Sequence, residues 1–193
     1  MVWGLIRLGY LDENRVQRGI EWIERYQRFD DKGSMPPKEW PYDKYKSCWG
    51  SHTCHMGLVK ALKALAEIPK GSRSNATKET IEKGAEYMLI HHIFKRSHDL
   101  EMVSKPSWKK FGFPKMWQTD ALEVTLILTK LGYRDPRMQE AIDLIASKQG
   151  KDGRWLLEST FNGRFQTNIE RKGMPSKFVT INALRVLKGW YGR

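Results

Sequence analysis

The residue types best suited to chemistry gather in one short stretch of this 193-residue chain, Cys48–Gly57, which reads CWGSHTCHMG. Cysteine and histidine side chains at close spacing are typical ligands of zinc. On a helix His52 and His55 share one face, and Cys48 could reach them from the preceding loop. Three protein ligands and one open position would form a catalytic zinc site, with His52 at the reaction centre. The alternative is that these side chains are cavity-lining or buried polar residues that bind no metal.

A second group of polar residues shares one position at the start of three expected helices. Their sequences, TCHMGLV, TDALEV and INALRV, align so that the equivalent residues are Cys54, Asp120 and Asn182. A helix N-terminus presents free N–H groups and a partial positive charge, so it favours anions. We therefore expect these three side chains near the first helical turn, at one level of the fold. Capping of the helix is the alternative to ligand binding.

Other candidate residues surround these helix ends. Further candidates for binding at the mouth of a cavity are Gln118, Arg164, Arg171, Trp49 and Trp117. The two arginines lie in the last long loop and could hold a diphosphate together with the helix N-termini. Asp120 could act as a catalytic acid if burial raised its pKa.

The elements that must position these residues follow from the spacing of apolar residues and from turn signals. The expected order is helix, short turn, helix, long loop, repeated along the chain. Seven helices are expected, over Met1–Tyr10, Asn14–Arg28, Ser51–Glu67, Thr77–Phe94, Gln118–Leu131, Pro136–Lys148 and Lys177–Leu187. All short turns then fall at one end of the structure and all long loops at the other, which makes the long-loop end the candidate active face.

One internal pattern occurs three times, in Gly19–Met35, Gly84–His92 and Ala141–Trp155. Each copy begins with a small residue on a helix and places a polar residue eight positions later, Gln in the first and third copies and His in the second. Only the third copy continues to a Gly-x-Trp. Internal repetition indicates a repeat architecture. The sequence therefore predicts an all-α protein, a single domain over residues 1–193.

The third copy is similar to the repeat of terpenoid cyclases and protein prenyltransferases. The matching residues are Ala141, Leu144, Ile145, Gln149, Gly153 and Trp155. This resemblance implies an α/α toroid, in which inner helices surround a central cavity and outer helices pack behind them. It also implies that the Gln and the Trp tie a loop to helix ends and are not catalytic. With about 3.5 helix pairs, the array here would be a partial toroid.

The resemblance implies two classes of function. His52-Thr53-Cys54 resembles a His-Thr-Cys sequence of protein prenyltransferase β-subunits, in which the His is a zinc ligand. The Asp-x-Cys that those enzymes also need is absent, because Gln118–Ala121 supplies an Asp and no Cys. The Asp-x-Asp-Asp of terpenoid cyclases is absent too. The first class is a transferase or cyclase for an isoprenoid-like apolar substrate with an anionic head group. The second is a non-catalytic toroid module that binds a ligand or a protein partner.

Composition and net charge limit which partners and which cellular compartment we expect. The chain has 34 Lys and Arg against 22 Asp and Glu, a net charge of +12. Because the cations are scattered, a solvated surface or an anion-binding cavity is expected rather than a nucleic-acid interface. Two cysteines, no visible signal peptide and no apolar run of about 18 residues indicate a cytoplasmic protein without a membrane span. A partial toroid would expose apolar faces, which predicts a homodimer or a longer natural chain.

Overall fold

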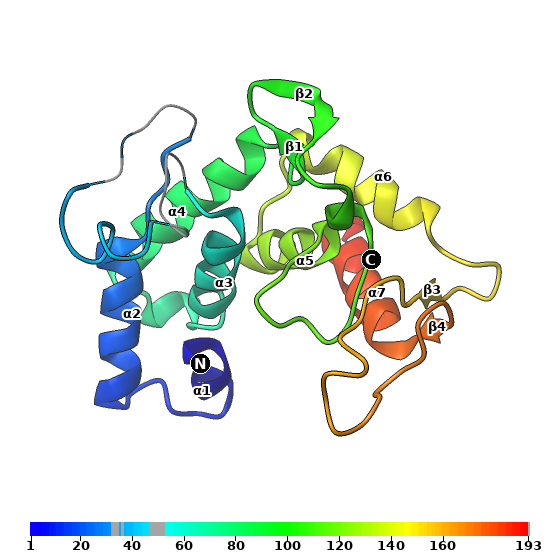
Figure 1. Ribbon diagram of the computed structural model, residues 1–193, viewed down its shortest axis with the longest axis horizontal. Helices are drawn as coiled ribbons and strands as arrows, with labels where there is room; N and C mark the ends of the chain where they lie inside the picture. Colours follow the sequence, from blue (N-terminus) through cyan, green and yellow to red (C-terminus); the bar gives the residue numbers. More distant parts are fainter. Residues whose placement is uncertain (32–34, 36, 47–52, 193) are drawn as a thin grey trace. The chain divides into compact units, whose positions relative to one another are not determined.

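The computed structural model describes residues 1–31, 35, 37–46 and 53–192. These residues form seven α-helices, drawn in chain order in Figure 1: α1 (Val2–Arg7), α2 (Asn14–Tyr26), α3 (His55–Leu65), α4 (Asn75–Ile90), α5 (Ala121–Leu131), α6 (Gln139–Ser147) and α7 (Lys177–Tyr191). Three short 3-10 helices are η1 (Lys70–Ser72), η2 (Pro106–Lys109) and η3 (Pro136–Met138). The sequence predicted an all-α protein, and the described residues are indeed mostly helical, although they also contain short strands.

Two small antiparallel sheets lie within the long loops. One joins β1 (Lys95–Arg96) to β2 (Asp99–Val103), and the other joins β3 (Trp155–Leu156) to β4 (Pro175–Ser176). The sequence predicted these segments as loops, and each sheet has only two short strands. In the described part of the chain, no helix has both the length and the apolar composition needed to cross a bilayer.

The chain divides into two compact units, Met1–Tyr87 and Met88–Arg193, with the boundary inside α4. The single domain predicted over residues 1–193 stays a prediction, and each unit is described here by itself.

The helix ends differ from the predicted ones by a few residues, for local reasons. The third helix begins at His55 with Cys54 as its N-cap residue, whereas Ser51, the predicted cap, lies outside the described residues. The fifth ends as predicted on Gly132, whose φ of 96° is a left-handed conformation that glycine adopts without strain. The last helix continues to Tyr191 and ends on Gly192, which is also left-handed.

In the first unit, the small residue of the repeat marks a close contact between paired helices. A Cβ atom at Gly19 of α2 would lie 2.8 Å from a methyl carbon of Val2 in α1. A Cβ at Gly84 of α4 would lie 2.8 Å from a methyl carbon of Leu62 in α3. A larger side chain would have to displace Val2 or Leu62 from its place on the paired helix, which favours a small residue at the start of the pattern.

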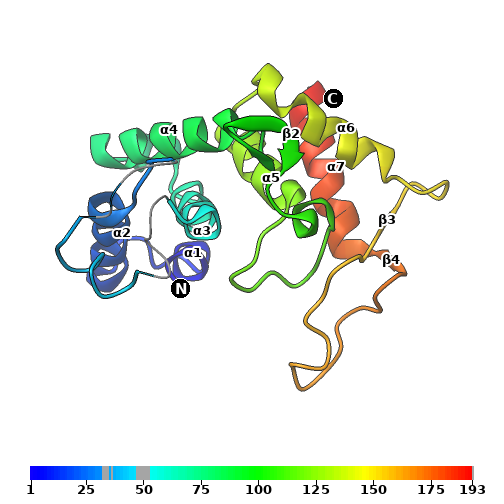
Figure 2. The ribbon, with the colours of Figure 1, turned by 45° about the horizontal axis from the view of Figure 1, so that its top comes forward.

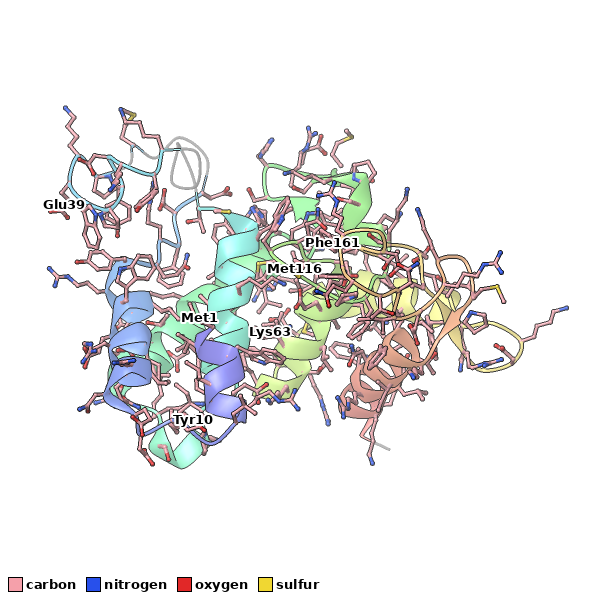
Figure 3. All side chains as sticks on the ribbon, turned by 60° about the horizontal axis from the view of Figure 1, so that its bottom comes forward. Met1, Tyr10, Glu39, Lys63, Met116 and Phe161 are labelled. Carbon is pink, nitrogen blue, oxygen red and sulfur yellow. The ribbon has the colours of Figure 1, made fainter. Side chains whose placement is uncertain are left out.

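Polar and aromatic contacts hold the remaining helices of this unit. Trp3 of α1 donates its indole N–H to Glu67 at 3.0 Å, and the Lys63 ammonium of α3 lies 4.4 Å from the centre of the Trp3 ring. Figure 3 shows Lys63 beside α1. The α2 and α4 helices are joined by the carboxylate of Glu24, which accepts hydrogen bonds from the hydroxyls of Ser74 and Thr77.

In the second unit, α5 and α7 pack against each other and α6 packs against both. The apolar residues between these helices are buried: Val124, Leu128, Ala141, Ile142, Ile145, Val179, Ala183 and Val186. Ala141, the small residue of the third repeat, is among them, so it occupies a buried position as Gly84 does in the first unit.

The Gln and Trp of the third repeat tie a loop to the end of α6. The indole N–H of the fully buried Trp155 donates to the carbonyl of Ile145 at 2.6 Å. The side-chain amide of Gln149 donates to the carbonyl of Gly153 at 3.2 Å, across the turn that precedes Trp155. The backbone N–H of Trp155 donates to Thr180 of α7 at 3.0 Å. Gln149 and Trp155 thus form structural hydrogen bonds in this copy.

The first copy does not reproduce this tie. Its Gln27 side chain donates to the neighbouring Arg28 carbonyl at 2.7 Å, and Met35, near the Trp position, is largely exposed. In the middle copy His92 has a φ of 42°, and its Nδ1 lies 3.9 Å from the carboxylate of Glu140.

We expect Trp155→Phe to lower the free energy of unfolding by about 2–3 kcal/mol, because it removes buried volume and a hydrogen-bond donor to a buried carbonyl. Urea unfolding followed by circular dichroism measures this loss. Trp117→Phe is the control, since Trp117 is 63% exposed and its replacement should change stability by less than about 0.5 kcal/mol. Equal effects of the two replacements would contradict the structural role of Trp155.

A second prediction concerns the cap of η3. The Asp135 carboxylate accepts the backbone N–H of Arg137 at 2.9 Å and is held by the Arg137 guanidinium, which lowers the pKa of Asp135 to about 2. This folded-state pKa lies below the value of the unfolded chain, so the ionised carboxylate stabilises the fold above about pH 4, and the stabilisation is lost as the pH falls toward 2.

Asp135→Asn keeps an acceptor for the cap and removes the charge. Because the ion pair is partly exposed, we expect a loss of about 1 kcal/mol at neutral pH. The difference in the free energy of unfolding between Asp135→Asn and the original protein should fall to about half by pH 3. Denaturant unfolding at both pH values measures it, and a difference that does not depend on pH would show that the charge contributes nothing.

Candidate functional site

The predicted acid, Asp120, is the N-cap residue of α5. Its Oδ1 accepts the backbone N–H of Glu123 at 2.9 Å, which is the capping hydrogen bond expected of an Asp at this position. Glu123 itself is the acidic residue of the first helical turn. The Asp120 side chain is almost completely buried, so it contacts protein and not solvent.

The second carboxylate oxygen of Asp120 is also occupied. Oδ2 accepts the backbone N–H of Gly112 at 3.0 Å and forms an ion pair with the Lys115 ammonium. Burial raises the pKa of the Asp120 carboxyl, whereas Lys115 and the N–H of Glu123 act in the opposite direction. Three donors to one carboxylate satisfy both oxygens, and a buried carboxylate requires such partners.

The loop that contacts Asp120 is held firmly on its other side. A Cβ at Gly112 would lie 2.5 Å from the carbonyl oxygen of Ser159, so only glycine allows this approach. The N–H of Phe111 donates to Glu158 at 2.8 Å, and Glu158 also pairs with Lys148 at 2.5 Å. The loop therefore lies against the segment after β3 through fixed hydrogen bonds.

Aromatic packing closes the same region. Phe111 is fully buried, and Phe113 stacks on Phe178 of α7 with ring centres 3.8 Å apart. Of the residues that precede Asp120, Trp117 is 63% exposed and Gln118 is half-buried. The geometry around Asp120 is thus that of a structural cap that fastens a loop. A catalytic role for Asp120 stays a prediction.

The equivalent position on α3 is occupied by Cys54. It is the N-cap residue, but its thiol makes no capping hydrogen bond and is half-buried. The next residue, His55, packs edge-on against Tyr87 with ring centres 5.0 Å apart. The Tyr87 hydroxyl lies 3.3 Å from Nδ1 of His55, and burial raises the pKa of Tyr87, so this phenol stays protonated.

The zinc prediction falls largely outside the part of the chain that the structure describes. Cys48, Trp49 and His52 are not among the described residues, and His55 is the only predicted ligand that is. Nδ1 of His55 faces the Tyr87 hydroxyl. Among the described residues, no three His, Cys, Asp or Glu side chains are grouped in a way that could hold an ion. Zinc at Cys48, His52 and His55 stays a prediction.

The expectation that Asn182 shares the helix-end position is wrong. Because α7 begins at Lys177 and is capped by Ser176, whose hydroxyl accepts the N–H of Val179 at 3.0 Å, Asn182 lies in its second turn. The alignment of apolar residues placed Asn182 level with Asp120, although this helix was expected from Lys177, where it does begin. Asp120 precedes α5 as its N-cap residue, whereas Asn182 lies inside α7. Arg164 and Arg171 both lie on the exposed loop between β3 and β4.

The sequence analysis did not identify an exposed row of residues along α7. We call it the α7 stripe; its members are Lys177, Ile181, Leu184, Lys188 and Tyr191. The three apolar members are 46%, 48% and 57% exposed, in chain order. Their spacing is helical, so the sequence carried the signal, but only packing decides which apolar row of a helix faces the core.

A scan against protein-family models finds none that matches this chain, and searches of curated proteins and of solved structures find no match either. The toroid arrangement and the isoprenoid chemistry that the resemblance implies therefore stay predictions.

The role of Asp120 can be tested through stability. We expect Asp120→Ala to lower the free energy of unfolding by about 3 kcal/mol, because it removes a buried helix cap and leaves the half-buried Lys115 ammonium and the Gly112 N–H without their acceptor. Asp152→Ala is the matched control, since that exposed carboxylate pairs with Arg154 in a surface turn and its loss should lower stability far less than Asp120→Ala. If the two variants unfold at the same denaturant concentration, Asp120 is not a structural cap.

Proposed function

We propose that this protein is a non-catalytic module of helix pairs, related to the α/α toroid architecture of prenyltransferases and terpenoid cyclases, that binds protein through the α7 stripe. The partner that the stripe fits best is a second copy of the same chain. This is the second of the two function classes implied by the sequence.

The observation that carries the proposal is that α7 is apolar on two opposite faces. One face, formed by Val179, Ala183 and Val186, is buried within its own unit. At about 100° per residue, Ile181 and Leu184 point to the other side of the helix. A helix with apolar residues on all sides is normally buried on all sides. The stripe side of α7 is instead exposed to water. A protein surface that covers the stripe would remove this exposure.

The charges on the stripe favour an antiparallel pairing of two copies. Lys177 and Tyr191 each stand seven residues from Leu184, on opposite sides of it. With a two-fold axis at Leu184, the Lys177 ammonium of one copy would meet the Tyr191 ring of the other, a favourable cation–π arrangement. The Lys188 stem would cover Ile181 of the other copy. No two cations of the stripe would face each other directly.

The expected affinity is modest. A helix of 15 residues is about 22 Å long, and one such contact buries less than the roughly 1,200 Å² of a standard stable interface. We therefore expect a dimer that forms at micromolar concentrations and dissociates on dilution.

Enzymatic transformation of an isoprenoid has less support. Neither the Asp-x-Asp-Asp nor the Asp-x-Cys motif occurs, and Asp120, the acid that could replace them, accepts three hydrogen bonds from the protein. A proton donor must reach its substrate, and a carboxylate with both oxygens engaged does not.

The test is the molar mass in solution, measured by analytical ultracentrifugation over a range of concentrations. We expect the mass to approach twice the 22.6 kDa of the monomer at high concentration. The double variant Ile181→Ser, Leu184→Ser should stay monomeric, with unchanged circular dichroism because both side chains are exposed.

The matched control is Leu100→Ser, Met102→Ser, which removes two exposed apolar side chains from β2. This control should dimerise like the original protein. A monomeric mass at every concentration, or equal loss of dimer in both double variants, would overturn the proposed pairing.

A further inference from the structure

The loop between β3 and β4 extends away from the helices of its unit, as Figures 1 and 2 show in two orientations. It connects Leu156 to Pro175, and every residue from Gly163 to Ile169 is exposed. Phe161, labelled in Figure 3, lies shortly before this exposed run. Loops that project in this way are where binding surfaces are most often found.

Hydrogen bonds hold the loop in a defined shape. The side-chain amide of Asn162 donates to the carbonyl of Glu170 at 2.6 Å, and the N–H of Gly163 donates to the Asn168 side chain at 3.2 Å. These two contacts join the ends of the segment 163–169, which we call the loop tip. At the base, the N–H of Gly173 donates to the Leu157 carbonyl at 2.8 Å. The tip is therefore a closed turn on an anchored stem.

The exposed side chains of this loop are apolar and cationic. Phe165, Ile169 and Met174 are 36% to 50% exposed. The cations on the same loop are Arg164, Arg171 and Lys172. In the described residues no ion pair involves any of these three.

The one acidic residue between the tip and β4, Glu170, is directed toward the protein. Its carboxylate accepts the backbone N–H of Lys177 at 2.9 Å and the hydroxyl of Ser176, both at the start of α7. The negative charge is therefore used to anchor the loop to a helix N-terminus, and the loop presents positive charge outward.

We propose that this loop docks onto an anionic lipid bilayer, with Phe165 and Ile169 entering the headgroup region and Arg164 and Arg171 binding lipid phosphates. Exposed aromatic and aliphatic side chains beside cations match the two components of such a surface, an apolar interior and a negative headgroup layer. A free phosphate would use the cations and leave the apolar side chains in water. The net charge of +12 draws the whole chain toward the same surface.

This docking is independent of the proposed pairing through α7, because the loop tip shares no residue with the α7 stripe. Failure of one proposal leaves the other standing, and the two are measured by different experiments.

Sedimentation with vesicles tests the proposal. One set of vesicles is phosphatidylcholine, and the other contains about a third phosphatidylglycerol, so that only the second carries a negative surface. We expect the protein to sediment with the anionic vesicles and to remain in solution with the neutral ones. Addition of inorganic phosphate at matched ionic strength should not release it.

Two double variants separate the contributions of charge and apolar contact. Arg164→Glu, Arg171→Glu should weaken the partition onto anionic vesicles by tenfold or more, roughly the effect of two to four lost cation contacts. Phe165→Ser, Ile169→Ser should also weaken it several-fold, although it leaves the charge unchanged. All four side chains are exposed, so the fold should be preserved, as circular dichroism would verify.

The matched control is Arg15→Glu, Arg18→Glu, which makes the same change of net charge on the exposed surface of α2. The control should bind far better than Arg164→Glu, Arg171→Glu. Equal binding of these two variants would show attraction by net charge alone and overturn the proposal. So would binding that survives Phe165→Ser, Ile169→Ser unchanged, or release by inorganic phosphate.

Discussion

The helix pairs of the first unit depend on close packing of a side chain of one helix against a glycine of the other. Gly19 and Gly84 lie where a Cβ atom would come within 2.8 Å of a side chain on the paired helix, and Ala141 is fully buried at the corresponding place of the third repeat. Interiors pack at the density of organic crystals, so an added methylene at such a contact cannot be absorbed without displacing the side chain that it meets. This steric constraint explains why the small residue is the most regular feature of the repeat.

The polar residues at the loop ends of the helices stabilise the fold. Asp120 caps α5 and fastens the loop of Gly112, Glu158 binds Phe111 and Lys148, and Glu170 binds the start of α7. Each buried or half-buried carboxylate has several donors, as a low-dielectric environment requires. A carboxylate used in this way has little capacity left to transfer a proton to a ligand. In the second unit these carboxylates therefore serve to anchor loops to the helices.

What these contacts leave exposed is a second apolar face on α7 and a cationic, apolar loop tip. The two surfaces differ in kind. The α7 stripe is a rigid row on a helix that is packed on its other face, so it suits a complementary protein surface. The loop between β3 and β4 projects from the helices and carries cations beside exposed apolar side chains. It therefore suits a layered, deformable surface such as a lipid headgroup region. These two surfaces are the ones on which the proposed pairing and the proposed lipid docking rest.

The sequence by itself determined the helical class and the order of the seven helices, because periodicity is a local property. It left open whether Asp120 caps a helix or binds a ligand, and the structure shows the cap. The sequence also identified Trp155 and Gln149 as a structural pair. Tertiary structure alone decided that Asp120 accepts hydrogen bonds from Gly112 and Lys115. It also decided which of two apolar rows on α7 is buried. Those outcomes depend on contacts between residues far apart in the chain, and neither spacing nor composition encodes which side chains will meet.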